Sequence, residues 1–202
     1  CAEEQVSQYE KSIILYDDGI GRVDYISHMG SDLTVVNSAR VSFGIEKSQL
    51  DNRDRKLISY LIKHRHTSTL EHCVVTFKFT VPLFVRSQHH RHRTWSYNEI
   101  SRRYTDKDLQ FYLPKAFRTQ HKSNRQASNP DEVANPVILH DWSDYGEGIR
   151  ASEILETQTN RALDVYRDLM SNGVCREQAR MILPQNLYTE YYGTTNLNNW
   201  IC

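Results

Sequence analysis

The hydrophobic pattern predicts β structure early in the chain. Between residues 73 and 81 the odd positions are apolar and most even positions are polar, which indicates a strand with one buried face. Residues 12–16 and 22–27 flank the sequence Asp-Asp-Gly-Ile-Gly and predict a hairpin with a glycine-containing turn. Antiparallel strands are therefore expected in this part of the molecule.

Apolar residues at helical spacing predict two helices on either side of residue 45. The first is capped by Ser31 or Asp32 and runs through Arg40. The second opens at Asp51 or Asn52. Its apolar stripe is expected in the core and consists of Leu57, Ile58, Leu61 and Ile62.

A third helix is expected from Pro82, because proline suits the first helical turn. It would carry Gln88 and Arg91 three positions apart on one face. The residues that follow Arg91 would then start at a helix end. Residues 101–104 would come after a loop.

The longest predicted helix spans residues 151–172, with Gly173 as its carboxy-terminal cap. Its inward positions are Leu155, Ala162, Tyr166, Leu169 and Met170. A shorter helix over residues 176–183 should stop near Pro184. Residues 124–136 are polar and contain two prolines, which predicts a mobile surface loop.

Strands and helices do not alternate strictly, so the pattern favours the α+β class. A length of 202 residues suits one domain or two small lobes that share a core. No segment approaches about 18 consecutive apolar residues, which predicts no membrane span. The first five residues, Cys-Ala-Glu-Glu-Gln, show no apolar run, and we expect a cytoplasmic protein.

Charge is balanced over the chain but concentrated in one segment. Lys and Arg number 25, as do Asp and Glu, yet residues 86–103 hold five arginines and a single acid, Glu99. Guanidinium groups match the geometry of phosphate and carboxylate. The interleaved Trp95, Tyr97 and Tyr104 offer flat faces for a ring. Phosphate together with a planar ring describes a nucleotide or a flavin.

Two other classes of site use similar residues. Grooves for single-stranded nucleic acid combine arginine with aromatic rings, although such domains are usually basic as a whole. A metal site is not expected, since the chain has neither a His-Glu-x-x-His nor a Cys-x-x-Cys pattern. The histidines considered for such a site are His64, His66, His72, His89, His90 and His92.

Residues 91–104 match the motif Arg-His-Arg-x-x-Ser-x-Asn-Glu-x-Ser-x-Arg-Tyr at all nine fixed positions. Three further segments match the same protein family and occur in the order typical of it, namely Ala39-Arg40-Val41-Ser42-Phe43, His66 with Glu71-His72, and residues 176–188. In these segments the chain resembles the flavin-dependent thymidylate synthases, the ThyX family. Only residues 115–142 have no clear counterpart.

This resemblance implies a mixed α/β subunit with antiparallel strands and a long-helix core, which assembles as a homotetramer with active sites at subunit interfaces. Residues 1–202 would form one catalytic domain that lacks part of the family's carboxy-terminal helical segment. That segment carries an arginine implicated in activating the uracil. Neither a nucleic acid nor a membrane is an expected partner.

The implied reaction is reductive methylation of dUMP to dTMP. Carbon comes from 5,10-methylenetetrahydrofolate, NADPH reduces FAD, and the flavin delivers the hydride without an enzyme nucleophile. A flavoprotein that has lost catalysis and only stores or senses nucleotide is an alternative.

The resemblance also implies roles for individual residues. Catalytic roles fall to Arg180, Arg91 and His66. FAD contacts are expected from Ser42, Ser68, Arg91, His92, Arg93, Thr94, Glu99, Asn196 and Asn198. Nucleotide contacts are expected from Gln88, His89, His90, Arg91, Glu99, Ile100, Ser101, Arg102, Arg103 and Arg180. Because Asn198 stands where the family has arginine, one contact to the flavin phosphates is weakened or replaced.

Simple chemistry leaves several of these roles open. Glu99 could neutralise Arg91 or Arg103. Arg180 could form an ion pair at a subunit interface. His66 could be a hydrogen-bonded core histidine.

Nucleophilic catalysis is not expected from this chain. A nucleophilic Ser101 would need an adjacent base, and we favour phosphate binding for this residue. Cys73 alternates with apolar residues on an inward strand face. Cys175 precedes Arg176, which could lower its pKa, and is the one candidate among the cysteines.

Overall fold

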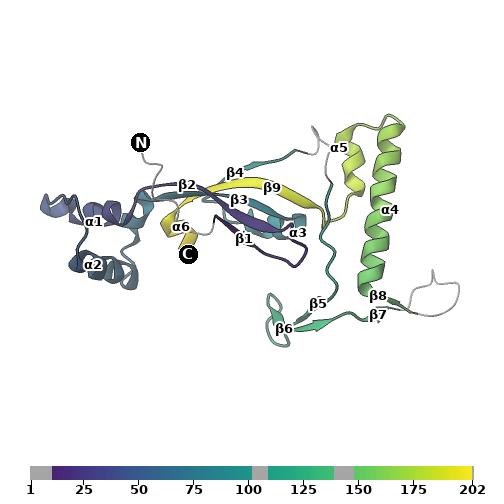
Figure 1. Cartoon of the computed structure of the whole chain (residues 1–202), viewed down its shortest axis with the longest axis horizontal. Helices are drawn as coiled ribbons and strands as arrows, with labels where there is room; N and C mark the ends of the chain where they lie inside the picture. Colours follow the sequence, from purple (N-terminus) through teal and green to yellow (C-terminus); the bar gives the residue numbers. More distant parts are fainter. Residues whose placement is uncertain (1–10, 102–108, 139–147, 202) are drawn as a thin grey trace. The chain divides into compact units, whose positions relative to one another are not determined.

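The computed structural model describes residues 11–101, 109–138 and 148–201 (Figure 1). The sheet pairings with a defined register in these residues are antiparallel. The predicted mixed α/β fold with antiparallel strands is therefore confirmed. Two compact units are present: the first comprises Cys1–Val81, Val85–Ile100 and Thr189–Cys202, and the second comprises Pro82–Phe84 and Ser101–Tyr188.

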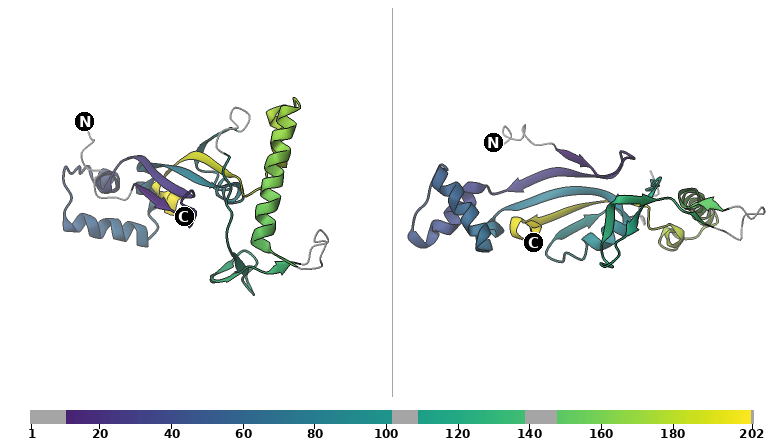
Figure 2. Two further views of the ribbon diagram at one scale, coloured as in Figure 1. Left: turned by 45° about the vertical axis from the view of Figure 1, so that its right-hand side comes forward. Right: turned by 90° about the horizontal axis from the view of Figure 1, so that it is seen from below.

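The first unit is built around a five-stranded sheet in the order β1-β2-β3-β9-β4. The strands are β1 Ser12–Ile14, β2 Arg22–Met29, β3 Val74–Pro82, β4 Ser96–Glu99 and β9 Tyr188–Asn196. The predicted hairpin is confirmed, with Ser12 opposite Asp24 on β1 and β2. β9 and β4, absent from the predicted elements, complete the sheet, and β9 lies between β3 and β4 (Figure 2).

β3 confirms the predicted strand but not its single buried face. Thr80, Val81 and Pro82 are all buried at its end. A strand covered on both faces loses the alternation of burial. Pro82 does not open a helix as predicted, because it ends β3 and α3 begins at Leu83. The fixed backbone angle of proline suits the end of a strand as well as the start of a helix.

α1 Asp32–Arg40 and α2 Asn52–Lys63 confirm the first two predicted helices. Leu61 of α2 is buried, and Leu57 and Ile58 pack against the same core cluster. Ile62 is 46% exposed, so its predicted place in the core was wrong. One residue turns about 100° around a helix, which carries Ile62 away from the face that Leu61 buries.

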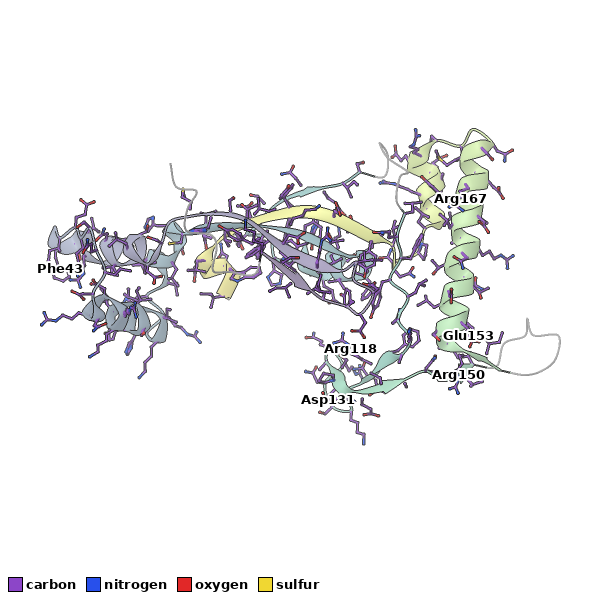
Figure 3. All side chains as sticks on the ribbon, in the orientation of Figure 1. Phe43, Arg118, Asp131, Arg150, Glu153 and Arg167 are labelled. Carbon is purple, nitrogen blue, oxygen red and sulfur yellow. The ribbon has the colours of Figure 1, made fainter. Side chains whose placement is uncertain are left out.

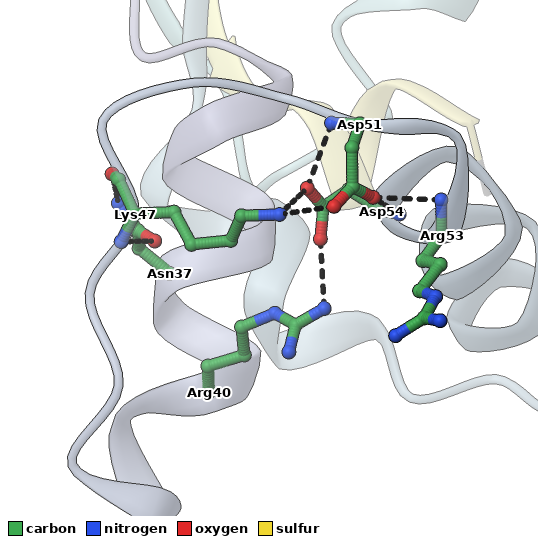
Figure 4. Close-up of polar contacts among 6 residues, drawn as sticks. All are labelled: Asn37, Arg40, Lys47, Asp51, Arg53 and Asp54. Carbon is green, nitrogen blue, oxygen red and sulfur yellow. Dashed lines mark hydrogen bonds and ion pairs between the residues drawn. The ribbon is translucent and has the colours of Figure 1, made fainter.

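A buried carboxylate joins α1 to α2 (Figure 4). Asp54 is fully buried and accepts hydrogen bonds from Nη2 of Arg40 (2.7 Å) and from Nζ of Lys47. Lys47 also pairs with Asp51 at 2.8 Å, and the Asn37 amide makes two hydrogen bonds of 2.9 Å to the Lys47 backbone. The hydrogen bond from Lys47, with those from the other partners, lowers the pKa of Asp54 to about 2. The carboxylate therefore stays ionised and fixes the turn between the helices.

The second unit contains the predicted long helix, α4 Ala151–Ser171, followed by Gly173 with a φ of +83°. The α4 residues predicted to face inward are all at least partly buried. The helix predicted over residues 176–183 is shorter, because α5 ends at Ala179 and a 3-10 turn follows. α4 and these turns enclose a core of Tyr166, Ala179, Leu183 and Leu187.

The remaining elements are short. They are α3 Leu83–His89, α5 Arg176–Ala179, α6 Leu197–Ile201, β5 Phe117–Gln120, β6 Ser128–Ala134, β7 Val137–Ile138, β8 Ile149–Arg150 and the 3-10 helices Val41–Phe43, Thr67–His72 and Arg180–Ile182. None of the helices in the described ranges is long and apolar enough to cross a membrane.

Residues 124–136 do not form the predicted mobile loop, because most of them belong to β6, which pairs with β5. The register shifts between Arg118 and Thr119, and Pro130 falls in the resulting bulge. A bulge accommodates proline because no ladder hydrogen bond is needed there. The charged side chains of Arg118 and Asp131 project from this hairpin (Figure 3). A polar sequence can thus form strands where neither face is buried.

Candidate functional site

The arginine-rich segment leaves the carboxy-terminal end of α3 in tight turns. In residues 90–95, which we term the arginine loop, the N–H of Arg91 donates to the Gln88 carbonyl (3.1 Å) and that of His92 to the His89 carbonyl (3.0 Å). The prediction that the helix extends to Arg91 was wrong, and Gln88 and Arg91 share no helical face. Hydrogen bonds to the third preceding residue tighten a chain more than helical ones do.

The carboxylate of Glu99 is hydrogen-bonded to other residues of the first unit. Its Oε2 accepts hydrogen bonds from Arg86 Nη2 (2.5 Å) and Nε (3.0 Å), and its Oε1 accepts one from Thr189 (2.8 Å). The alternative in which Glu99 pairs with Arg91 was wrong, and Arg103 lies outside the described residues. Arg86 is the partner because it stays on α3 opposite β4, whereas the turns carry Arg91 to an exposed position.

Arg91, His92, Arg93 and Thr94 are all exposed. Within the described ranges, no carboxylate forms an ion pair with Arg91 or Arg93. The chain has as many acids as bases, so composition does not require that two guanidinium groups of one loop lack an ion-pair partner among the described residues. The arrangement favours an external anion, with phosphate or carboxylate as the best geometric match.

Trp95 and Tyr97, the aromatic residues of the segment that the structure describes, pack against other rings of the first unit. Trp95 is 9% exposed and its ring centroid lies 6.0 Å from that of Phe79. The prediction that Trp95 offers a face to a ligand ring was therefore wrong. Tyr97 stacks on His90 at 4.0 Å, and Tyr104 lies outside the described residues. Trp95 lies just before β4, and local sequence does not reveal which way its ring points.

His89 also belongs to this aromatic cluster. Its ring lies 4.7 Å from that of Trp95, and its Nδ1 lies 2.7 Å from the hydroxyl of Tyr191. Burial, with the neighbouring charges of His92 and His90, lowers the pKa of His89 to about 4. Burial also raises the pKa of Tyr191. Both partners are therefore neutral near pH 7.

Three of the predicted site residues lie around α1 and α2. Ser42 is exposed in the turn after α1, beside Phe43, which is 77% exposed (Figure 3). Ser68 is exposed in the 3-10 helix Thr67–His72, and His66 immediately precedes that helix. His66 is exposed and stacks on Tyr60, with ring centroids 6.3 Å apart. The alternative of a core histidine was therefore wrong.

The two predicted asparagines lie where β9 meets α6. The Oδ1 atom of Asn196 accepts a hydrogen bond from the backbone N–H of Asn199 (2.9 Å). Asn198 donates one to Oε1 of Glu71 (3.3 Å), which links α6 to the 3-10 helix that holds Ser68. These side chains thus belong to the first unit, as the arginine loop does.

Other predicted residues belong to the second unit or to the chain between the described ranges. Ser101 is partly buried and belongs to the second unit. Arg180 also belongs there, is exposed, and donates from Nε to a backbone carbonyl three residues earlier (3.3 Å). Ile100 ends the first unit and is 38% exposed. Arg102 and Arg103 lie outside the described residues.

The two cysteines within the described ranges differ in their exposure to solvent. Cys73 is buried, as predicted, and burial raises the pKa of its thiol. Cys175 is exposed just before α5. In the same ranges no group of three or more His, Cys, Asp or Glu side chains is placed to hold a metal ion.

Sequence reasoning missed Thr189 and Tyr191, which hold Glu99 and His89 from β9. Residues 188–195 are tyrosines and threonines with one glutamate and one glycine. Aromatic and β-branched residues are enriched in strands, so this composition was the available signal.

A family model described as "Thymidylate synthase complementing protein" matches residues 24–202. The chain is 42% identical over 179 residues to the flavin-dependent thymidylate synthase of Thermus thermophilus, a match that covers 89% of this chain and 61% of that relative. It is 39% identical over 176 residues to the corresponding protein of Kosmotoga olearia, covering 87% of this chain and 71% of that one.

Solved structures agree with these relatives. The crystal structure of the UMP/dUMP methylase PolB from Streptomyces cacaoi bound with 5-Br dUMP has a TM-score of 0.65 and 32% identity, covering 86% of this chain and 72% of that chain. The chain therefore belongs to the thymidylate synthase complementing family, whose relatives named above are flavin-dependent thymidylate synthases. The resemblance inferred from the motif is confirmed. The chain spans about three fifths of the length of the Thermus relative.

Proposed function

We propose that this protein takes part in de novo dTMP synthesis as a flavin-dependent thymidylate synthase. Its substrates would be dUMP, 5,10-methylenetetrahydrofolate and NADPH, and its products dTMP, tetrahydrofolate and NADP⁺. The observation that carries the proposal is the exposed arginine loop, in which Arg91 and Arg93 have no carboxylate partner among the described residues. The fit of this loop to anionic ligands, in a chain of this family, supports a nucleotide site.

The donor set suits FAD, which would supply the redox chemistry when bound. Its two phosphates need several hydrogen-bond donors at the surface. Arg91, His92, Arg93 and Thr94 are exposed in one loop, and Ser42 and Ser68 present hydroxyl groups in the same unit. Asn196 and Asn198 would add amide contacts. Glu99 would contribute indirectly, because it holds Arg86 by a hydrogen bond.

The nucleotide needs two kinds of contact, and the chain offers both. Ser101 would donate to the dUMP phosphate. Arg91 and Arg180 would face the uracil oxygens. Arg180 would be supplied within a homotetramer whose active sites lie at subunit interfaces. Positive charge there stabilises the negative charge that develops on uracil as C5 becomes a carbon nucleophile. Other nucleotide contacts would come from Gln88, His90, Ile100, Arg102 and Arg103. His66 would lie near the flavin.

Arg91→Ala tests the proposal at the residue assigned to both ligands. Purified wild-type protein should show the yellow absorption of flavin and form dTMP from dUMP when the folate and NADPH are present. The variant should lose about 30-fold or more in affinity for each ligand, because a hydrogen bond to a charged group contributes about 1.5–3 kcal/mol and Arg91 would make at least one to each ligand. Absorption spectra, dUMP titration and product analysis give the three readouts.

Arg53→Ala is the matched control, since Arg53 is another exposed arginine of the first unit and its guanidinium makes no contact in the ion-pair network (Figure 4). It should bind both ligands like the wild type. Normal flavin content with unchanged dUMP affinity in Arg91→Ala would contradict the assignment. A colourless wild-type protein that binds oligonucleotides with steep salt dependence would favour the nucleic-acid alternative instead. A yellow protein that binds dUMP without forming dTMP would favour the non-catalytic flavoprotein.

A further inference from the structure

The hydroxyl of Tyr97 lies at the base of the arginine loop. It is 3.0 Å from the carbonyl oxygen of His89 and 3.1 Å from that of His92, and its single proton is shared between these two acceptors. These two carbonyls lie on either side of Arg91, in the turn that the His92 N–H closes onto His89. Carbonyls at a helix end have lost their helical partners. The Tyr97 hydroxyl therefore satisfies the backbone that carries Arg91.

The ring of Tyr97 is itself held firmly. β4 pairs with β9, which places Tyr97 opposite Gly193. The ring stacks on His90 at 4.0 Å and lies edge-on to that of Tyr191 at 5.9 Å. Burial raises the pKa of Tyr97, so its hydroxyl keeps its proton near pH 7 and remains a donor. A fixed ring with a protonated hydroxyl restricts the turn to one backbone conformation.

Among the described residues, the contacts around the loop do not use the Arg91 or Arg93 side chains. Arg86 forms an ion pair with Glu99, and the neutral His89 is hydrogen-bonded to the Tyr191 hydroxyl. Within the described ranges the loop is thus anchored by its backbone and by the rings of His90 and Trp95, and not by the Arg91 or Arg93 side chains. A binding loop that is ordered before its ligand arrives loses less conformational entropy on binding.

We propose that Tyr97 is a positioning residue for the arginine loop. Its hydroxyl holds the His89 and His92 carbonyls together, so that Arg91 points to the ligand before the nucleotide or flavin binds. This inference rests on the proposed function for the identity of the ligands. The contact of Tyr97 with the loop backbone does not depend on it.

Tyr97→Phe removes the hydroxyl and keeps the ring. In the full protein the dissociation constants for FAD and dUMP should both rise about tenfold, the effect of losing one or two hydrogen bonds that preorganise the loop. The KM for dUMP should rise in parallel, and turnover at saturating ligand should recover. Amide hydrogen exchange in residues 90–94 should speed up, while the melting temperature stays within a few degrees.

Tyr192→Phe is the control, because Tyr192 adjoins Tyr191 on β9 and is 46% exposed. It should change neither affinity nor exchange. The proposal is overturned if Tyr97→Phe binds both ligands and exchanges like the wild type, or if exchange rises evenly over the whole sheet with a matching loss of stability. If wild-type protein bound neither FAD nor dUMP, the proposed function would fail, and the exchange of residues 90–94 would still decide the role of Tyr97.

Discussion

The turn after α1 and the arginine loop both present polar residues at the surface of the first unit, but different forces hold them. The turn that carries Ser42 is anchored by charges, since the buried Asp54 carboxylate takes up Arg40 and Lys47. The arginine loop is anchored by aromatic rings, backbone hydrogen bonds and a neutral histidine.

The difference has a physical reason. A carboxylate placed inside the arginine loop would neutralise the guanidinium groups that an anionic ligand needs. The single acid in residues 86–103, Glu99, pairs with Arg86, which lies one turn before the loop. The turn with Ser42 offers hydroxyl and backbone groups, so a carboxylate beneath it removes no binding group. A loop that binds anions is best held by neutral contacts.

Asp54→Asn should have the largest effect on stability, because it leaves Arg40 and Lys47 without their buried partner. The melting temperature should fall by about 10 °C. dUMP affinity should change by less than about twofold in the folded variant, since the arginine loop is held independently. Thermal unfolding followed by circular dichroism gives the first value and dUMP titration gives the second.

Asp164→Asn is the control for this change, because the Asp164–Arg167 pair is exposed and its closest atoms are 3.7 Å apart. Its melting temperature should move by no more than about 1 °C. An Asp54→Asn variant as stable as this control would show that the ion pairs do not hold the two helices together.

The neutral His89 predicts that acid weakens the aromatic cluster. His89 has a pKa of about 4 in the folded protein and 6.5 as its ordinary value, so the unfolded chain binds its proton first. Stability from this residue is therefore complete above pH 6.5 and is lost as the pH falls toward 4, by on the order of 3 kcal/mol in all. Urea unfolding between pH 7 and pH 4 measures this slope.

His89→Phe should flatten that pH dependence, whereas His64→Gln on the exposed end of α2 should keep it. The titratable groups that adjoin His89 in the described ranges include His90, His92, Tyr97 and Tyr191. The opposite sign, with stability rising toward pH 4, would mean that His89 is charged in the folded protein.

Gly193→Ala should give the smallest of these effects. A Cβ atom at Gly193 would lie 2.9 Å from Cε2 of Phe79 and 3.1 Å from Cε3 of Trp95, so one of the two rings must shift. The free energy of unfolding should fall by on the order of 2 kcal/mol. Exchange in the arginine loop should rise with it, because the same rings support His89.

Thr194→Ala, one residue along β9, removes the hydrogen bond between the hydroxyls of Thr194 and Thr76 and leaves the ring cluster intact. It should cost about 1 kcal/mol and leave the loop unchanged. If amide hydrogen exchange in the arginine loop were the same in Gly193→Ala and Thr194→Ala, the aromatic rings would not support the loop.

Much of this protein can be predicted from local sequence. The helical spacing of the apolar residues around Leu61 in α2 and around Tyr166 in α4 predicts helices with one buried face, and the structure contains them. Helical periodicity and capping depend on residues within a few positions of one another, which the sequence displays directly. The motif in residues 91–104 likewise identifies the family, since it needs only residue types at fixed spacing.

Tertiary structure decided which side chains and strands contact one another. Glu99 pairs with Arg86 and Thr189, Trp95 turns inward, and α3 ends before Arg91. β9 joins residues distant in sequence, and β6 forms from polar residues that pattern alone assigns to a loop. Each of these outcomes depends on which distant backbone or side chain lies nearby, and a one-dimensional pattern does not contain that distance. The sequence therefore determined which residues can bind anions, and the fold decided which of them stay free to do so.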